Sequence, residues 1–186
     1  ISSEGRVCGA LVKCLETGRE LKVSCGTVVN ATGVWSDDIE NFVGQDSSRV
    51  RASKGIHLVI PRDRINLETG LILRTSESVL FVIPSGTHWI VGTTDTDWQL
   101  DRAHPAASKR DIDYLLGTLN RVVENPIAIQ DVVGVYAGLR PLLKGDAAAT
   151  SKLSREHVVT TSTAGLVSIS GGKYTTYRVM ALDTID

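Results

Sequence analysis

Several features that mark whole classes of protein are scarce or missing in this sequence. The three cysteines, Cys8, Cys14 and Cys25, are odd in number and form no CxxC pair, so we expect packing roles in a reducing compartment. The four histidines show neither HxH nor HxxxH spacing, which argues against a metal site. No apolar run approaches the length of a membrane span, and the first residues do not form a signal peptide.

An excess of charge of either sign is also missing. The chain carries 20 Lys and Arg against 21 Asp and Glu, a net charge of −1, and no basic run exceeds two residues. Nucleic acid is therefore not an expected partner, because binding to phosphates needs a basic surface. A hydrophobic fraction of 42% over 186 residues is instead typical of a globular domain with its own core.

A third absence concerns the ends of the chain. It opens on Ile1 rather than Met, and residues 182–186 continue a helical pattern without a glycine or proline stop. We therefore expect this sequence to be an excised piece of a longer protein.

The most informative stretch that is present is Ser170–Arg178, with the sequence SGGKYTTYR. A β-branched run precedes it and a helix-forming run follows it, an order that presents free backbone N–H groups to an anion or an electron-rich ring. Gly171 and Gly172 allow close approach of the backbone to a ligand. Lys173 adds a positive charge at the same place. The alternative is an ordinary strand-to-helix turn with a solvated lysine.

A second junction of the same kind lies near the N-terminus. Residues 27–33 form an apolar strand that runs into Thr-Gly. Ser36 is predicted to cap the following helix, with Asp37 and Asp38 in the first turn, where the helix dipole favours carboxylates. The alternative is an ordinary connection between a strand and a helix.

Alternating and β-branched runs predict strands in much of the remaining chain. These runs are Arg6–Leu15 with Leu21–Cys25, Ser53–Pro61, Leu71–Leu73, Val79–Ile83 with His88–Val91, Ile127–Val135, Val158–Thr161 and Leu166–Ile169. Ser108 and Asp111 form a capping box ahead of a helix whose apolar stripe, from Ile112 to Val123, belongs to the core. Strands dominate, which predicts an α+β fold with a mixed, largely antiparallel sheet.

Single polar residues give weaker signals. His57, near the start of a predicted strand, is by itself more typical of a core or surface residue than of a catalyst. Arg140 precedes Pro141, so its backbone is held extended and its side chain can be aimed. Asp95 and Asp97 lack the remaining ligands of a calcium loop, which favours a polar turn.

Five blocks, in this order along the chain, carry a resemblance to a known family. They are residues 28–37 (VVNATGVWSD), 53–61 (SKGIHLVIP), 91–97 (VGTTDTD), 138–142 (GLRPL) and 171–178 (GGKYTTYR). Together they resemble the FAD-dependent glycerol-3-phosphate dehydrogenases, within the D-amino-acid-oxidase-like flavoprotein superfamily. The resemblance covers nearly the whole chain, and the last block is the most specific.

The resemblance implies an FAD-binding domain of Rossmann type interleaved with a substrate-binding domain built on a mixed sheet. Residues 1–45 and 134–186 would belong mainly to the FAD-binding side, and residues 46–133 mainly to the substrate-binding sheet and helix. The chain departs from the family pattern because it has no G-x-G-x-x-G after a strand. We expect the part of the family that carries this fingerprint upstream of Ile1, and the family's C-terminal helical domain beyond Asp186.

The resemblance also implies roles for individual residues. The family oxidises sn-glycerol 3-phosphate to dihydroxyacetone phosphate with hydride transfer to FAD; here His57 would be the general base and Arg140 would hold the C2 oxygen. Arg155 and Lys173 match positions that face the substrate phosphate, with an exposed ion pair to Glu156 as the alternative for Arg155. The positions implied to line the flavin are Ala31, Thr32, Gly33, Gly138, Leu139, Gly171, Gly172, Lys173, Tyr174 and Thr175. Those implied to shape the site without touching the reacting atoms are Thr93, Thr94 and Asp95.

Three interpretations stay open on the sequence alone. The first is part of a dehydrogenase of glycerol metabolism that passes electrons to a quinone, cytoplasmic and peripheral to the inner face of the cell membrane. The second keeps the fold but uses oxygen as the electron acceptor, which gives a glycerol-3-phosphate oxidase. The third is a non-catalytic, substrate-side module that folds alone and does not hold FAD.

Overall fold

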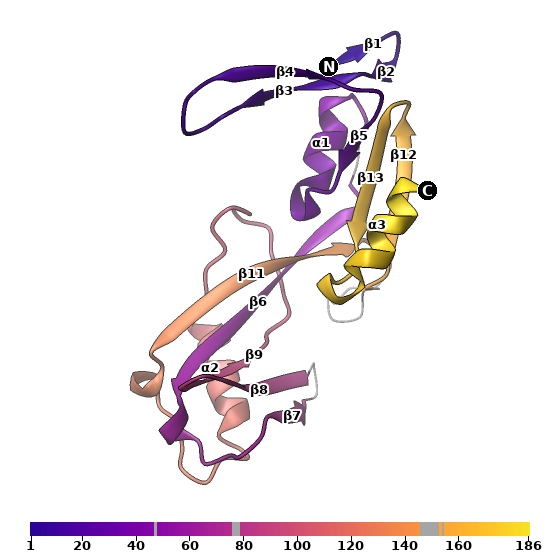
Figure 1. Ribbon diagram of the computed structural model, residues 1–186. Coiled ribbons are helices and arrows are strands. Elements are labelled where there is room, and N and C mark those ends of the chain that lie inside the picture. The colour runs from indigo at the N-terminus through magenta and orange to yellow at the C-terminus, as the bar shows by residue number, and fades with distance from the viewer. Residues whose placement is uncertain (47, 76–78, 146–152, 154) are drawn as a thin grey trace. The chain divides into compact units, whose positions relative to one another are not determined.

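The computed structural model describes the chain except residues 47, 76–78, 146–152 and 154. It contains two compact units (Figure 1). Unit 1 holds the described residues of Ile1–Arg51, Pro141–Ala147 and Leu153–Asp186, and unit 2 holds those of Ala52–Arg140. Strands dominate and most strand pairs are antiparallel, so the predicted α+β class is confirmed.

Unit 1 is built on a three-stranded sheet in the order β12-β13-β5 (Figure 1). β12 (His157–Thr163) and β13 (Leu166–Gly171) form an antiparallel pair, whereas β5 (Val28–Asn30) runs parallel to β13. The parallel register pairs Ser168 with Asn30, residues 138 positions apart in the sequence. Helices α1 (Ser36–Phe42) and α3 (Tyr177–Ile185) follow these two parallel strands, and both contact β13.

Two small hairpins complete unit 1. β1 (Ser2–Ser3) pairs with β2 (Arg6–Val7), and β3 (Gly9–Lys13) pairs with β4 (Glu20–Ser24), both antiparallel. The longer hairpin has the position that the N-terminal alternating runs predict, and its strands are largely exposed.

Unit 2 is built on a larger sheet in the order β10-β6-β9-β8-β7, with β11 also paired to β6 (Figure 1). The strands are β6 (Val50–Pro61), β7 (Leu71–Arg74), β8 (Val79–Ser85), β9 (His88–Gly92), β10 (Thr96–Asp97) and β11 (Gly134–Leu143). The boundary between the two units falls within β6 and β11.

Burial along β6 assigns its two faces. Ile56, Leu58 and Ile60 are completely buried and belong to one apolar cluster with α2 (Lys109–Leu119), whose contribution includes Leu115 and Leu119. Because side chains alternate along a strand, the odd-numbered positions of β6 face the opposite side of the sheet. His57 lies on that opposite side, away from the apolar cluster, and is only partly buried.

The predicted capping box at the start of α2 is present. Ser108 Oγ accepts from the Asp111 amide at 3.3 Å, and Asp111 Oδ2 accepts from the Ser108 amide at 2.8 Å. Both exchanges satisfy backbone donors that the first turn of a helix leaves unpaired.

Two local predictions are wrong. Ser36 is the first residue of α1 rather than its cap, because a 3-10 turn (Gly33–Trp35) precedes the helix and makes Trp35 the N-cap. The extended run predicted over 127–135 is interrupted by a 3-10 turn (Ile129–Asp131), in which Asp131 accepts from the Ala128 amide at 2.8 Å.

Candidate functional site

The two strand–glycine–helix junctions lie at the same edge of one sheet. β5 and β13 are parallel neighbours, so their carboxyl ends point the same way. β5 leads into Ala31–Gly33 and then α1, and β13 leads into Gly172–Lys173 and then α3. Ligands of sheets with parallel strands bind at the carboxyl ends of those strands, where helices begin.

The glycine pair at the second junction is required by the backbone. Gly171 and Gly172 have φ angles of +78° and +75°, which side chains with a Cβ rarely adopt. A Cβ on Gly171 would lie 2.4 Å from the Glu156 carbonyl oxygen, and one on Gly172 would lie 2.4 Å from Met180 Sδ. The pair therefore turns the chain sharply from β13 into the helix.

This edge of the sheet is exposed and carries several polar groups. The side chains of Ala31, Thr32, Lys173, Tyr174 and Thr175 are exposed. Tyr174 stacks on Tyr177, with ring centroids 5.7 Å apart. Exposed backbone without bulky side chains, a hydroxyl, a cation and a flat aromatic surface together fit a flavin nucleotide, and these residues would hold it.

His57 is the central polar residue on the open face of the unit 2 sheet. Its ring stacks on Tyr136 of β11, with centroids 4.9 Å apart and an interplanar angle of 16°. On the other side it is paired with Gly92 of β9, and a Cβ there would lie 2.3 Å from His57 Cδ2. Burial, and then the positive charge of Arg140, lower the pKa of His57 from its ordinary value of 6.5. The imidazole is therefore neutral near pH 7 and able to accept a proton.

Arg140, on β11, lies over Gly55 of β6, two residues along that strand from His57 and on the same face of the sheet. Its guanidinium occupies the space over Gly55, where a Cβ would lie 2.4 Å from Nη2 and 2.7 Å from Nη1. Nη2 donates to Thr93 Oγ1 at 3.0 Å and Nη1 donates to the Thr94 carbonyl at 3.2 Å. The structure thus brings the predicted base and the predicted cation together in one unit.

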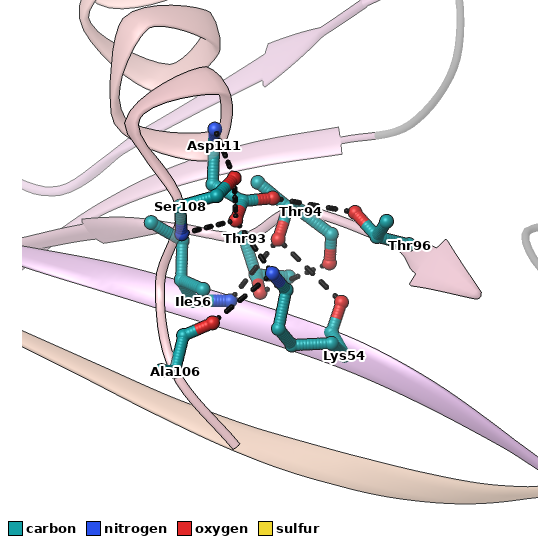
Figure 2. Close-up of polar contacts among 8 residues, drawn as sticks. All are labelled: Lys54, Ile56, Thr93, Thr94, Thr96, Ala106, Ser108 and Asp111. Carbon is teal, nitrogen blue, oxygen red and sulfur yellow. Dashed lines mark hydrogen bonds and ion pairs between the residues drawn. The ribbon is translucent and has the colours of Figure 1, made fainter. Parts of the chain in front are cut away.

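The Thr93–Thr94 segment connects Arg140 to β6. Thr94 Oγ1 accepts from the Ile56 amide at 3.1 Å (Figure 2). The Thr94 carbonyl accepts from Arg140. Thr94 is buried, and these two bonds tie the strand that carries His57 to the guanidinium. The two threonines therefore hold the guanidinium of Arg140 in place.

An ion pair supports the start of β6 from the core side of the sheet. Lys54 Nζ lies 2.6 Å from Asp111 Oδ2 and donates to the Ala106 carbonyl at 3.1 Å (Figure 2). The Lys54 ammonium also lies 4.9 Å from the centroid of Trp98. Burial alone would raise the pKa of Asp111, but hydrogen bonds from Lys54 and Ser108 outweigh burial and hold that pKa below its ordinary value.

The remaining candidate positions divide between the units. Gly138 and Leu139 lie on β11 next to Arg140, and Gly138 has open space around the position of a Cβ. Arg155 is exposed and comes just before β12 in unit 1, the unit that also holds Lys173.

Several residues that organise these sites were missed from the sequence. Tyr136 shares a face of β11 with Gly138 and Arg140, and that two-residue spacing could have revealed it. Gly55 and Lys54 lie in the block that contains His57, but nothing local predicts their contacts with Arg140 and Asp111.

Neither a metal site nor a membrane-spanning helix is found among the described residues. No group of three or more His, Cys, Asp or Glu side chains among them is arranged to hold a metal ion. Within the same residues, the helices are all too short or too polar to cross a membrane.

Comparison with known proteins places the chain in a family. A family model described as FAD dependent oxidoreductase (DAO) matches residues 3–178. This chain belongs to the DAO family of FAD-dependent oxidoreductases. The flavoprotein family predicted from the five sequence blocks is therefore confirmed.

Two relatives of this DAO-family chain are glycerol-3-phosphate dehydrogenases. It is 60% identical over 182 residues to glycerol-3-phosphate dehydrogenase 2 of Mycobacterium tuberculosis, a match that covers 97% of this chain and 31% of that protein. It is 37% identical over 187 residues to the human mitochondrial glycerol-3-phosphate dehydrogenase, covering 97% of this chain and 26% of that protein. The chain thus spans roughly a quarter to a third of the length of these relatives.

Solved structures agree with this DAO-family fold. The glycerol-3-phosphate dehydrogenase of Bacillus halodurans, complexed with FAD, superposes with a TM-score of 0.88 at 33% identity, covering 100% of this chain and 36% of that one. The L-α-glycerophosphate oxidase of Mycoplasma pneumoniae, with FAD bound, gives a TM-score of 0.69 at 16% identity, covering 94% and 48%. The second match shows a shared fold only.

Proposed function

We propose that this chain is part of a flavin-dependent glycerol-3-phosphate dehydrogenase. It carries the general base (His57), the cation that stabilises the C2 oxygen of the substrate (Arg140) and one side of the FAD site. The pairing of His57 with Arg140 on one open sheet face carries the proposal. The names of the relatives, at up to 60% identity over nearly the whole chain, support the substrate. In this proposal unit 1 is mainly the FAD-binding side and unit 2 mainly the substrate-binding side. The predicted division, 1–45 with 134–186 against 46–133, differs from these units at residues 46–51 and 134–140.

The proton of the C2 hydroxyl passes to an imidazole nitrogen of His57. A neutral imidazole is required for this step, and the lowered pKa of His57 provides it at pH 7. When bound, FAD supplies a hydride acceptor for the C2 hydrogen. Loss of the proton from the C2 hydroxyl oxygen and of the hydride from C2 forms the C=O bond and converts the secondary alcohol into the ketone of dihydroxyacetone phosphate.

Arg140 stabilises the negative charge that develops on the C2 oxygen as its proton leaves. Its permanent charge is held in place by Thr93 and Thr94, so little reorganisation is needed during the reaction. Loss of one such aimed donor typically lowers turnover by about 10² to 10³. Arg155 and Lys173 are assigned to the substrate phosphate.

At the sheet edge of unit 1, Ala31–Gly33 and Gly171–Thr175 hold the cofactor. Gly138 and Leu139 of β11 are assigned to the cofactor only by their match to the family's sequence blocks. We assign a quinone as the electron acceptor, and a cytoplasmic protein would reach it by associating peripherally with the membrane. A glycerol-3-phosphate oxidase is the second candidate, favoured only by the shared fold of the Mycoplasma pneumoniae enzyme.

The test uses a chain of the relatives' length that contains residues 1–186, here called the full-length form. It should reduce an electron-accepting dye with sn-glycerol 3-phosphate but not with glycerol, and without matching oxygen consumption. Oxygen consumption equal to dye reduction would favour the oxidase. No turnover of the phosphorylated substrate with either acceptor would refute the proposal.

The 186-residue chain is expected to behave differently by itself. It lacks the glycine fingerprint that binds the pyrophosphate of a dinucleotide, so we expect it to fold without retaining FAD. A visible flavin spectrum in the purified chain would contradict this expectation and remove the third interpretation, a module without cofactor.

A further inference from the structure

Glu40, on α1 of unit 1, is a buried carboxylate. Only 2% of the residue is exposed. One of its oxygens accepts from the Ser168 hydroxyl and the other from the Ser162 hydroxyl. Among the described residues no ion pair reaches it. Burying a carboxylate without a cation is unfavourable unless hydrogen bonds compensate, so these hydroxyls are bound in one defined arrangement.

That arrangement fixes the role of Ser168. A hydroxyl has one hydrogen, and Ser168 donates its hydrogen to Glu40. Its oxygen is therefore an acceptor toward the rest of the network, and Asn30 Nδ2 donates to it at 3.1 Å. The same nitrogen donates to the Ser36 carbonyl at 3.0 Å. Both side-chain amide hydrogens of Asn30 are thus donated to Ser168 and to the Ser36 carbonyl. This fixes the orientation of the amide group, with Oδ1 facing Thr32.

Asn30 Oδ1 holds the loop that follows β5. It accepts from Thr32 Oγ1 at 2.7 Å and from the Thr32 amide at 3.3 Å. Asn30 is only 1% exposed, whereas Thr32 is exposed. A path of hydrogen bonds therefore runs from Glu40 through Ser168 and Asn30 to the loop Ala31–Gly33.

We infer that Glu40 is a positioning residue that, through Ser168 and Asn30, sets the conformation and hydrogen-bonding character of the cofactor-facing loop. The inference rests on the proposed function, which gives this loop its ligand. It also specifies the ligand chemistry. The Thr32 hydroxyl hydrogen is committed to Asn30, so Thr32 Oγ1 meets the ligand as an acceptor. Its partner on the flavin nucleotide is a hydroxyl or N–H group.

Two serines provide a matched pair of variants. Ser168→Ala breaks the path from Glu40 to Asn30, whereas Ser162→Ala removes the other hydroxyl on Glu40 and leaves the path intact. Both lose a hydrogen bond to the same carboxylate, so a purely structural role for Glu40 predicts similar effects. Ser168→Thr restores a hydroxyl and serves as the rescue variant.

The experiment measures hydrogen exchange of the peptide covering residues 28–36 in the full-length form without flavin, and the Kd for FAD by fluorescence titration. Ser168→Ala should speed exchange in this peptide and raise the Kd about tenfold, a loss on the scale of one buried hydrogen bond. Ser162→Ala should change both by no more than about twofold, and Ser168→Thr should recover most of the loss. If Ser168→Ala does not fold, Glu40→Gln replaces it. The glutamine side chain places an NH₂ group, a donor, where one carboxylate oxygen now accepts from a serine hydroxyl, so the hydrogen-bond pattern of the path is disrupted.

The outcomes separate this inference from the proposed function. Equal effects of Ser168→Ala and Ser162→Ala, or unchanged exchange in residues 28–36, overturn the path from Glu40 to the loop and leave the proposed function standing. Faster exchange with an unchanged Kd for FAD overturns the assignment of the loop to the cofactor, and this inference falls with it.

Discussion

The guanidinium of Arg140 occupies the space that a side chain on Gly55 would fill. A Cβ on Gly55 would lie 2.4 Å from Nη2 of Arg140 and 2.6 Å from Thr93 Oγ1. The absence of a side chain at Gly55 therefore leaves room for the Arg140 guanidinium, which explains the glycine in the SKGIH block. His57 lies two residues further along the same face.

Gly55→Ala should therefore displace Arg140 and lower turnover of the full-length form about 10- to 100-fold, because an aimed donor moves. The measurement is kcat with sn-glycerol 3-phosphate, alongside thermal unfolding. Gly134→Ala on β11 is the control, since a Cβ there would lie 3.4 Å from Val59, an ordinary contact. Equal turnover in the two variants would contradict the role given to Gly55.

His57 should make the stability of the chain depend on pH. Burial and Arg140 depress its folded pKa below 6.5, so the unfolded state binds the proton more readily than the folded state. The free energy of unfolding should fall as pH decreases from about 7.5 through 6.5, and level off below the folded pKa of His57. Urea unfolding at several pH values should show this component in the wild type and not in His57→Gln.

Arg140→Gln should bring the folded pKa of His57 closer to its ordinary value, because the charge that opposes its protonation is removed. The pH-dependent loss of stability should therefore become smaller and level off at a higher pH. An identical pH dependence in the wild type and His57→Gln would show that the imidazole does not titrate as described.

The Lys54–Asp111 pair should contribute strongly to stability. Lys54→Met leaves a buried carboxylate without its cation, and we expect a loss of about 3–5 kcal/mol in the free energy of unfolding. Lys109→Met, which breaks the exposed Lys109–Asp113 pair, is the matched control and should cost at most about 1 kcal/mol. Urea denaturation of both variants compares them directly, and similar losses would refute the burial argument.

The turn after β13 should tolerate no side chain at its first glycine. Gly171→Ala combines a φ of +78° with a backbone clash and should cost about 3 kcal/mol in the free energy of unfolding. Gly18→Ala has a similar φ of +70° with nothing within 4 Å of the new Cβ, and should cost only about 1 kcal/mol. If thermal unfolding ranks them equally, the Glu156 carbonyl does not restrict this turn.

Local sequence patterns predicted much of the fold. The capping box of Ser108 and Asp111, the hairpins and the two strand–glycine–helix junctions follow from spacing and residue type alone. The prediction that Ser36 caps α1 was wrong, because a 3-10 turn over Gly33–Trp35 precedes the helix and makes Trp35 the N-cap.

Contacts between distant segments could not be predicted in the same way. The parallel pairing of β5 with β13 joins residues 138 apart, and it alone brings both junctions to one edge. The packing of Arg140 on Gly55 and of Lys54 on Asp111 likewise depends on strand order rather than on local pattern. The sequence blocks identified His57 and Arg140 as candidates, but only the pairing of β11 with β6 in the sheet brings the two residues close together.

The most direct test of the account is the rate at which sn-glycerol 3-phosphate reduces bound flavin in the absence of oxygen, followed by stopped-flow absorbance in the full-length form. We predict that His57→Ala and Arg140→Ala each slow this single step by at least about 10² while FAD stays bound at wild-type stoichiometry. Flavin reduction at the wild-type rate in either variant would contradict the assignment of that residue to the chemistry.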